Sequence, residues 1–524
     1  MNNIKFDLLT EHWIPVTTPD GGLIEIGIRE ALLNAHLLGE MQSNSALITT
    51  AQLRLLLAII YCACGPEDAD EWAEMWKGGM FPEQRINSYL DRWSDRFDLC
   101  SETLPFMQTP YLTMKEANSL AQLITEASCG NNATLFDHTL DETPPTYTLA
   151  HAAQRLVAAQ AFSIGFGKAG SAIICDKVME RPYLADAICL RGVSIWFSGK
   201  NLFEMLMLNL VPCSKENVGM PAWEYDDPFS TLDQIKNGKR ASKDAKGVAD
   251  RYSWMSRMIR LVIDTNGTVK KAYFTQGREA DKKPGDPMKV FVESKEAGIY
   301  ACGLNAEKAS WRDLNAYLGY GNHPNPIIQH TARQVDDEVL DRSYMFSLNV
   351  VGLATDPGKA AKLLLWRHDR MILPSELLRD RNAVEKMRIA LSDAEFVGRA
   401  IGKRIYRISW LFLPPEGNPD TKDVKNLSEA IDPRSTYWAR LETHFAEFLL
   451  NLIDDQNGAL DTWRNWVEKE ARDAFQGACD RLGANERAIK AVAQVPTTFS
   501  ANEAEVGLNI LAAKKKPKNA SKKE

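Results

Sequence analysis

Residues 165–170, Gly-Phe-Gly-Lys-Ala-Gly, spell the pattern GxGxxG, which in many enzymes holds the diphosphate of a nucleotide. That chemistry requires a strand before the first glycine and a helix that opens at the third, so that the helix dipole meets the phosphates. Here the preceding stretch 149–162 has helical periodicity, and the following stretch 171–176 is typical of a strand. This context argues against a nucleotide cofactor. An enzyme that holds one at Gly165–Gly170 is kept as the alternative function.

The same loop suits a second kind of chemistry. Glycines let a backbone approach a surface closely and present its N–H groups, and Lys168 would add a cation for a phosphate. A plain surface turn would use the same residues, and on these residues alone the plain turn is the favoured interpretation.

The rest of the chain lacks the common catalytic patterns. None of its 8 histidines lies in HExxH, and neither GxSxG nor a Walker A sequence occurs. Cys129 and His138 share a segment, but a thiol–imidazole pair needs spatial contact and a third, orienting group. The 9 cysteines are scattered, and the close pair Cys62 and Cys64 has no second Cys/His pair nearby. We therefore expect no enzyme activity, no metal and no cofactor.

Charge is unevenly distributed along the sequence. The net charge is −7, yet residues 1–150 hold 8 Lys/Arg against 21 Asp/Glu, whereas residues 236–290 hold 14 Lys/Arg against 6 Asp/Glu. This segregation predicts one face suited to phosphates and another suited to water or basic partners. A solvated loop would account for the basic block equally well.

These residues must be positioned by a chain that is too long, at 524 residues, for one compact core. Residues 4–30 predict a hairpin that turns at Asp20-Gly21-Gly22, and Asn266-Gly267 predicts a second tight turn. Apolar periodicity predicts helices over 28–38, 50–64, 66–76, 82–96 and 148–162, and strands over 188–197, 258–264, 272–275 and 290–292.

From about residue 375 the pattern becomes wholly helical. Amphipathic stretches joined by turns predict a bundle, with helices over 376–392, 395–413, 436–454, 460–482 and 486–495. The fold class is therefore α+β: a large mixed N-terminal domain followed by a C-terminal helical (four-helix) bundle. We place these domains at 1–374 and 375–510, followed by a disordered basic tail at 511–524.

No run of 18 or more apolar residues occurs, and the first residues do not resemble a signal peptide. We expect a cytoplasmic protein that does not contact a membrane.

Several blocks of the sequence resemble one known family. Asp7–Val16, Asp-Leu-Leu-Thr-Glu-His-Trp-Ile-Pro-Val, resembles the opening signature of CasA proteins, the large subunit of the type I-E CRISPR Cascade complex. Leu104–Thr109 is similar to the family's Pro-Phe-Met-Gln-Thr block. The Asn-rich and glycine loops, Arg367-His368-Asp369 and Tyr437–Glu442 follow in the family's order. The resemblance spans nearly the whole chain.

This resemblance implies a non-catalytic subunit of a ribonucleoprotein in which a guide RNA (crRNA) reads the target by base pairing. The protein would read only a short flanking motif (PAM) in double-stranded DNA from the minor groove, whose pattern is degenerate. It would also help start duplex opening and R-loop formation, and recruit the CRISPR helicase–nuclease. Its other partners would be the backbone, small and handle-binding Cascade subunits.

The resemblance also places four elements on this sequence. A loop meeting the guide RNA and the flank would comprise Asn131, Asn132, Leu135, Phe136, Asp137 and His138, unless Phe136 folds back onto its own domain. The DNA-binding elements would be the glycine loop Gly165, Phe166, Gly167 and Lys168, a cationic finger among Arg278, Lys282 and Lys283, and a wedge at Asp356, Pro357, Gly358 and Lys359. The family's wedge carries glutamine, which this tip lacks. In the bundle, Arg399, Lys403, Arg404 and Arg407 form a basic stripe for the displaced strand, or merely a solvated helix face.

Overall fold

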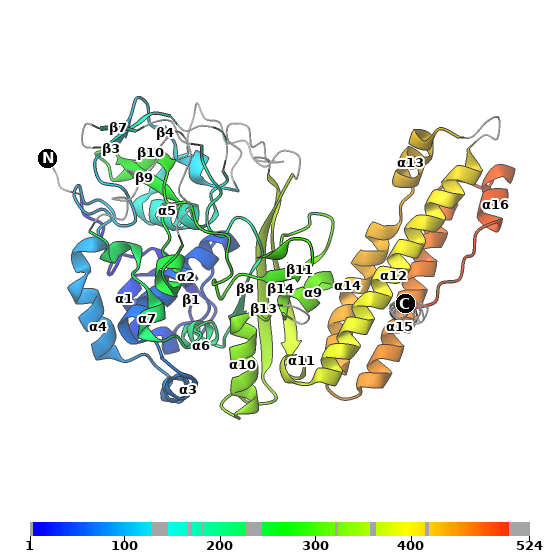
Figure 1. Ribbon diagram of the computed structural model, residues 1–524, viewed down its shortest axis with the longest axis horizontal. Coiled ribbons are helices and arrows are strands. Elements are labelled where there is room, and N and C mark those ends of the chain that lie inside the picture. Colours follow the sequence, from blue (N-terminus) through cyan, green and yellow to red (C-terminus); the bar gives the residue numbers. More distant parts are fainter. Residues whose placement is uncertain are drawn as a thin grey trace, which may run out of the picture. The chain divides into compact units, whose positions relative to one another are not determined.

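The structure, a computed structural model, describes residues 4–126, 145–165, 167, 170–174, 177–179, 183–226, 244–319, 323–356, 363–413 and 419–501 (Figure 1). The chain divides into two compact units. The first comprises residues 1–310, 316–341 and 346–371, and the second comprises residues 311–315, 342–345 and 372–524. The C-terminal unit thus takes two short segments from earlier in the chain.

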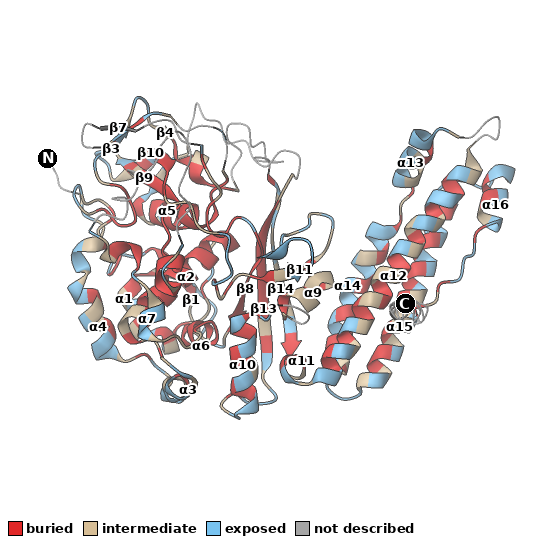
Figure 2. Cartoon of the chain, in the orientation of Figure 1, coloured by how far each residue is buried: buried red, intermediate tan, exposed pale blue. Residues whose placement is uncertain are grey.

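The first unit is built around one apolar helix. Helix α2 (Ala46–Cys64) is buried along almost its whole length, and its first turn is capped by Ser45, whose Oγ accepts a hydrogen bond from Leu47 N at 3.2 Å (Figure 2). Among the described helices α2 alone is long and apolar enough to cross a membrane, but 89% of that apolar window is buried within the chain. This burial fits a core helix packed by its own domain.

Helices α4 (Glu83–Arg92), α5 (Leu149–Phe162), α6 (Leu202–Leu208) and α8 (Val248–Tyr252) contact α2. The helices before residue 345 are α1 (Ile28–Leu33), α3 (Ala69–Gly78), α4 (Glu83–Arg92), α5 (Leu149–Phe162), α6 (Leu202–Leu208), α7 (Lys215–Val218), α8 (Val248–Tyr252), α9 (Leu314–Tyr317) and α10 (Pro326–Asp336). The predicted helices at 50–64 and 148–162 correspond to α2 and α5. The helix predicted over 28–38 stops at Leu33 and continues as a separate 3₁₀ turn at Ala35–Leu37.

Small sheets complete the first unit. The strands are β1 (Ile14–Thr17), β2 (Leu23–Ile26), β3 (Leu112–Met114), β4 (Asn118–Ser119), β5 (Tyr147–Thr148), β6 (Ala172–Ile174), β7 (Lys177–Met179), β8 (Ser194–Ser198), β9 (Arg257–Ile263), β10 (Thr268–Gln276), β11 (Phe291–Ser294), β12 (Gly298–Ala301), β13 (Met345–Thr355) and β14 (Leu363–Pro374). Both predicted turns are confirmed: β1 pairs with β2, and β9 pairs with β10. The sheet orders include β14-β13-β8 and β3-β6-β7, and β10 pairs with β4, β5 and β9.

One predicted strand is shorter than the pattern suggests. The apolar run 188–197 enters β8 only at Ser194, because residues 188–192 form a turn in which Gly192 has φ +112°. This turn carries Arg191 to the surface, next to the end of β13.

Burial of His330 makes the stability of the first unit depend on pH. The His330 ring on α10 packs edge-on against Trp72, 4.8 Å between ring centroids, and burial lowers the pKa of His330 to about 4. An unfolded histidine has a pKa near 6.5, so between these values the unfolded chain binds the extra proton. We therefore expect stability to be complete above about pH 6.5 and to fall by up to about 3 kcal/mol as the pH approaches 4.

The measurement is the urea midpoint from pH 7 to pH 4 for the wild type and His330→Leu. The variant should show a flatter pH dependence. Equal slopes in both proteins would assign the pH dependence to other groups.

The second unit is mostly helical in its described part. Its helices are α11 (Glu376–Arg379), α12 (Arg381–Phe412), α13 (Thr421–Ala430), α14 (Arg434–Asn451), α15 (Gln456–Asp480) and α16 (Glu486–Ala493). Long helices α12, α14 and α15 pack side by side around apolar faces (Figure 2). The fold class predicted from the sequence, a mixed unit followed by a helical region, is confirmed.

The division into helices differs from the prediction at one place. The break predicted between 392 and 395 is wrong, because α12 runs unbroken through it, and the short helix α13 was not predicted. The polar residue at the supposed break, Asp393, is buried and accepts a hydrogen bond from Arg464 Nε on α15 at 2.8 Å. Nearby, Trp463 and Tyr437 donate to the α12 carbonyls of Ala390 and Ala394, at 2.8 and 3.0 Å.

Candidate nucleic-acid interface

A buried arginine, Arg257, holds the backbone that leads into the glycine loop. Helix α5 ends at Phe162, and Arg257 Nη2 donates to the next carbonyls, Ser163 O at 3.3 Å and Ile164 O at 3.0 Å. Arg257 is 1% exposed. A cation at a helix C-terminus complements the helix dipole and satisfies carbonyls that have no partner in the helix. The loop therefore leaves α5 in a defined direction.

Two of the described loop glycines, Gly165 and Gly167, have different roles. A Cβ on Gly165 would lie 2.6 Å from Ala185 C and 2.7 Å from Leu184 O, so a side chain there collides with backbone. Gly167 has φ +43° and nothing within 4 Å of an added Cβ, so its backbone faces open space. Gly165 is thus needed for packing, and Gly167 is the point that another surface can approach. Phe166 and Lys168 lie outside the described residues.

The segment after the loop returns to support it. Gly165 N donates to Asp186 Oδ1 at 2.9 Å, and Leu184 N donates to Gly167 O at 3.1 Å. The same segment contacts β10, because Ala185 N donates to the Gln276 side-chain oxygen at 2.6 Å. Gln276 is the last residue of β10 and precedes residues 277–283, the segment that holds the three finger candidates. The segment that supports the glycine loop and the finger segment are therefore both anchored at the end of β10.

The structure does not present Arg278 as a finger. Its guanidinium is 8% exposed, forms an ion pair with the fully buried Asp250 at 2.7 Å, and lies 3.6 Å from the centre of the Trp254 ring. Withdrawing this cation would leave Asp250 buried without its charge partner. Arg278 therefore holds the base of the segment instead of reaching into a groove.

The two lysine candidates, Lys282 and Lys283, differ in their ion pairing. Lys282 is exposed and forms no ion pair with any residue in the described ranges. Lys283 Nζ lies 2.7 Å from Asp244 Oδ2, with both side chains about two-thirds exposed. This hydrogen bond raises the pKa of Lys283, but a surface pair of this kind adds little stability. Of the three candidates, Lys282 is therefore the best placed to act as the cationic finger.

The wedge is only partly described. Strand β13 ends at Thr355, Asp356 is half-buried, and Pro357, Gly358 and Lys359 lie outside the described residues. The loop expected to meet the guide RNA lies outside them as well; its residues are Asn131, Asn132, Leu135, Phe136, Asp137 and His138. At the foot of the wedge, Arg191 Nη1 donates to Thr355 Oγ1 at 2.7 Å.

In the second unit the basic stripe on α12 is divided. Arg399, Lys403 and Arg407 are exposed at helical spacing, and Arg407 lies 4.6 Å from the centre of the Trp410 ring. Arg404 turns away, because it donates to Thr498 O at 2.6 Å and lies over Phe499. A groove of about 470 Å³ runs between α12 and α13, and its lining includes Arg399, Lys403 and the half-exposed Tyr406.

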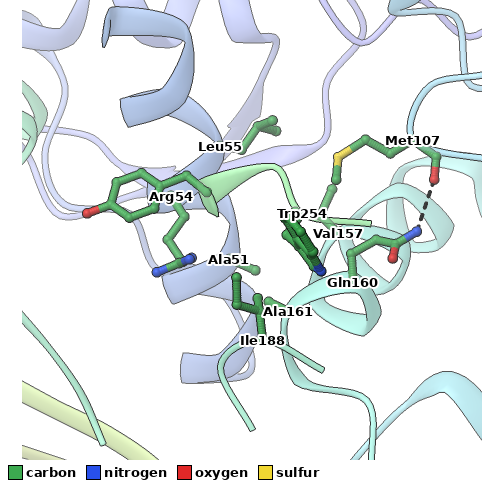
Figure 3. A pocket seen from close by; sticks show the side chains of 10 residues that line it. Ala51, Arg54, Leu55, Met107, Val157, Gln160, Ala161, Ile188 and Trp254 are labelled. Carbon is green, nitrogen blue, oxygen red and sulfur yellow. Dashed lines mark hydrogen bonds between the residues drawn. The ribbon is translucent and has the colours of Figure 1, made fainter. Parts of the chain in front are cut away.

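The described surroundings of the glycine loop do not suit the nucleotide cofactor of the alternative function. Helix α5 precedes the loop and strand β6 follows it, so no helix N-terminus opens at its third glycine. A cavity beside the end of α5 has a volume of about 10 Å³, which is enough for at most one water molecule (Figure 3). In the described part of the chain, no three His, Cys, Asp or Glu side chains gather as a metal site would require.

Three of the family-like sequence blocks, at Trp13, Gln108 and Arg367, make contacts that hold the fold. Gln108 donates to Leu99 O at 2.8 Å and accepts from Leu261 N at 2.9 Å, and Trp13 donates to Leu8 O at 3.0 Å. Arg367 holds the 305–308 turn by donating to its carbonyls. Sequence reasoning missed Asp186, Arg191 and Gln276, which tie the loops together. Single polar residues in unremarkable segments carry no signal that would have revealed them.

These features define a class of protein: a mixed unit that presents open backbone at Gly167 and an exposed lysine, Lys282, from one scaffold, followed by a helical unit. Residues 7–474 match the family described as CRISPR-associated protein Cse1, and the chain belongs to that family. The resemblance to CasA proteins is thereby confirmed.

Relatives match the chain over nearly its whole length. The CRISPR-associated protein CasA/Cse1 of Thermus thermophilus is 30% identical over 97% of this chain and 99% of its own. The crystal structure of Thermus thermophilus CasA has a TM-score of 0.80 at 28% identity, covering 98% of this chain and 100% of that one. A chain of a structure titled CRISPR RNA-guided surveillance complex has the same fold, with TM-score 0.72 at 20% identity, covering 94% and 98%.

Proposed function

We propose that this chain is the large subunit of a CRISPR RNA-guided surveillance complex and breaks no bonds itself. It reads a short flanking motif in double-stranded DNA from the minor groove, helps to open the duplex, and recruits the helicase–nuclease. Its partners are the crRNA, the backbone, small and handle-binding subunits, and the target DNA, in the cytoplasm. Family membership and the fold shared with a surveillance-complex chain support this proposal.

One observation carries the DNA-reading part. Gly167, with its open backbone, and the exposed Lys282, which pairs with no carboxylate among the described residues, extend from elements joined by the Ala185–Gln276 hydrogen bond. A side-chain-free backbone fits a shallow groove, and an inserted cation gains from the negative potential there. Because minor-groove acceptors are degenerate, this arrangement predicts tolerance of several flanking sequences.

The test is a comparison of assembled particles. Complexes with crRNA are prepared with and without this chain, and binding is measured to duplexes that share one target but differ in the flank. We expect flank discrimination only when the chain is present. A particle that lacks the chain and discriminates flanks equally well would overturn the proposal.

Lys282 should make the phosphate or groove contact. For Lys282→Ala in the assembled particle, we expect the slope of log K against log salt to flatten by about 0.9, the value for one phosphate neutralised. Flank preference should weaken by about 1–3 kcal/mol if Lys282 also reads a base edge. The measurement is duplex binding at four salt concentrations.

Two further variants calibrate this result. Lys283→Ala should have a smaller effect, because Asp244 already pairs with that lysine. Lys77→Ala, an exposed lysine on α3, should leave the slope unchanged. Equal slopes for Lys282→Ala and Lys77→Ala would remove Lys282 as the finger.

The helical unit would guide the displaced strand. Arg399, Lys403 and Arg407 lie on α12 near the part-exposed rings of Tyr406 and Trp410. Cations for the backbone beside flat rings for the bases are the usual combination in single-strand binding. Arg404 is left out of this surface, because it holds residues 498–499. The same stripe on a helix that contacts no nucleic acid would be a solvated face.

A further inference from the structure

We propose that Arg191 is a positioning residue that couples the glycine loop to the wedge hairpin, so that reading the flank and opening the duplex are linked. This inference rests on the proposed function of those two elements. It concerns a side chain that does not itself touch DNA.

The bridge is a continuous chain of polar contacts. The Asp186 carboxylate accepts from Gly165 N at one oxygen, 2.9 Å away, and from Arg191 Nε at the other, 2.6 Å away. Arg191 Nη1 then donates to Thr355 Oγ1 at 2.7 Å. Gly165 begins the glycine loop, and Thr355 is the last residue of β13, at the foot of the wedge. A displacement of Gly165 or of Thr355 would therefore move the Arg191 guanidinium.

The turn that carries Arg191 is itself fixed to the scaffold. Ile188 N donates to Ser256 Oγ at 3.2 Å, and the Ile188 carbonyl accepts from Lys289 Nζ at 2.8 Å. Ala185 N donates to Gln276, whose side chain is 2% exposed. The segment 184–191 thus contacts the glycine loop, the strand before the finger and the wedge strand.

The guanidinium suits this role and an ammonium does not. Arginine is planar and carries donors at both Nε and Nη, so it can hold a carboxylate and a hydroxyl in fixed directions at once. Lysine has one charged centre on a flexible stem. The pair Arg191–Asp186 is 46% and 27% exposed, so its contribution to stability is small and its effect should appear in geometry instead.

A competing role for Arg191 is direct contact with a phosphate, since it is half exposed. The two roles predict different results for Arg191→Lys. A phosphate contact needs only a positive charge, so lysine would preserve binding and its salt dependence. A two-ended bridge would be broken by lysine almost as fully as by alanine. Thr355→Val provides an independent break, because it removes the acceptor at the wedge and changes no charge.

The experiment uses the assembled particle with crRNA. Flank discrimination is measured by binding to permuted flanks, and opening by fluorescence of 2-aminopurine at the first base pair beside the flank. We expect Arg191→Lys and Thr355→Val each to lower flank-dependent opening about fivefold, within the usual range for coupling between sites. The slope of log K against log salt should stay at the wild-type value in both.

The double variant Arg191→Lys/Thr355→Val should be no worse than either single variant, because both break the same bridge. Arg333→Lys, on an exposed arginine of α10 that pairs with Asp337, serves as the control and should leave opening unchanged. Full opening with Arg191→Lys, or a salt slope that falls with Arg191→Ala and recovers with lysine, would overturn the bridge in favour of a phosphate contact. Additive losses in the double variant would overturn it too.

Failure of this inference can be told apart from failure of the proposed function. If Gly165→Ala loses flank discrimination while the Arg191 and Thr355 variants keep flank-dependent opening, only the bridge is wrong. If all three variants and the particle without this chain discriminate flanks normally, the proposed function is wrong.

Discussion

Gly165→Ala should abolish most flank-dependent binding while the chain stays folded. One added methyl would lie 2.6 Å from Ala185 C, 2.7 Å from Asp186 N and 2.7 Å from Leu184 O. All three are backbone atoms, so no side-chain rotation can relieve the overlap and the loop must move. A lost base-reading contact is typically worth about 1–3 kcal/mol, so we expect discrimination to fall by about tenfold or more.

A matched substitution lies in the same loop. A Cβ on Gly170 would meet only Met114 Cε, the far end of a flexible side chain, so Gly170→Ala should bind almost as the wild type does. Gly167→Ala should lie between them, because φ +43° strains an alanine by about 1–2 kcal/mol but no atom obstructs it. Binding to permuted flanks measures all three. If Gly165→Ala and Gly170→Ala behave alike, the glycine loop does not meet the DNA as proposed.

Local patterns were enough to predict much of the fold. The turns at Gly21 and Gly267 need positive φ, and both glycines have it, at +86° and +72°. The buried helix α2 was evident from its apolar run. Where the prediction was wrong, tertiary contacts override local preference. Ser392-Asp393 resembles a helix boundary, but Arg464 on another helix satisfies the Asp393 carboxylate, so α12 continues.

The candidate site was less predictable from sequence, for a different reason. A glycine loop can be located by its residue types, but the residues that fix it are distant in sequence. Asp186 lies 21 residues from Gly165, and Gln276 lies 91 residues from Ala185, which it holds. The choice of a finger among the three cations also required the burial of each side chain. In the sequence alone, Arg278 is as good a candidate as Lys282. Arg278 is excluded as the finger only because its guanidinium is buried, where it pairs with Asp250 and lies over the Trp254 ring. Such facts depend on three-dimensional packing that no local period encodes.

Arg54→Met should be the most destabilising single change in the first unit. Arg54 lies on α2 and pairs with Asp286 at 2.8 Å, both side chains being 1% exposed. It also donates to Arg251 O at 3.1 Å, and its guanidinium lies 4.3 Å from the centre of the Tyr252 ring. Methionine fills a similar volume but leaves the carboxylate buried without a cation. Breaking a buried pair in this way costs about 3–5 kcal/mol.

The origin of this loss is testable within the same pair. If the uncompensated charge is responsible, Arg54→Met/Asp286→Asn should recover much of the stability, because asparagine carries no charge and can still accept from Met288 N as Asp286 does, at 3.1 Å. Arg29→Met, which breaks a pair whose Asp91 is 68% exposed, should cost less than about 1 kcal/mol. Hydrogen exchange of α2 amides measures each variant. A double variant as unstable as Arg54→Met would assign the loss to packing around Tyr252, and the buried charge would then contribute little to holding α2 in the core.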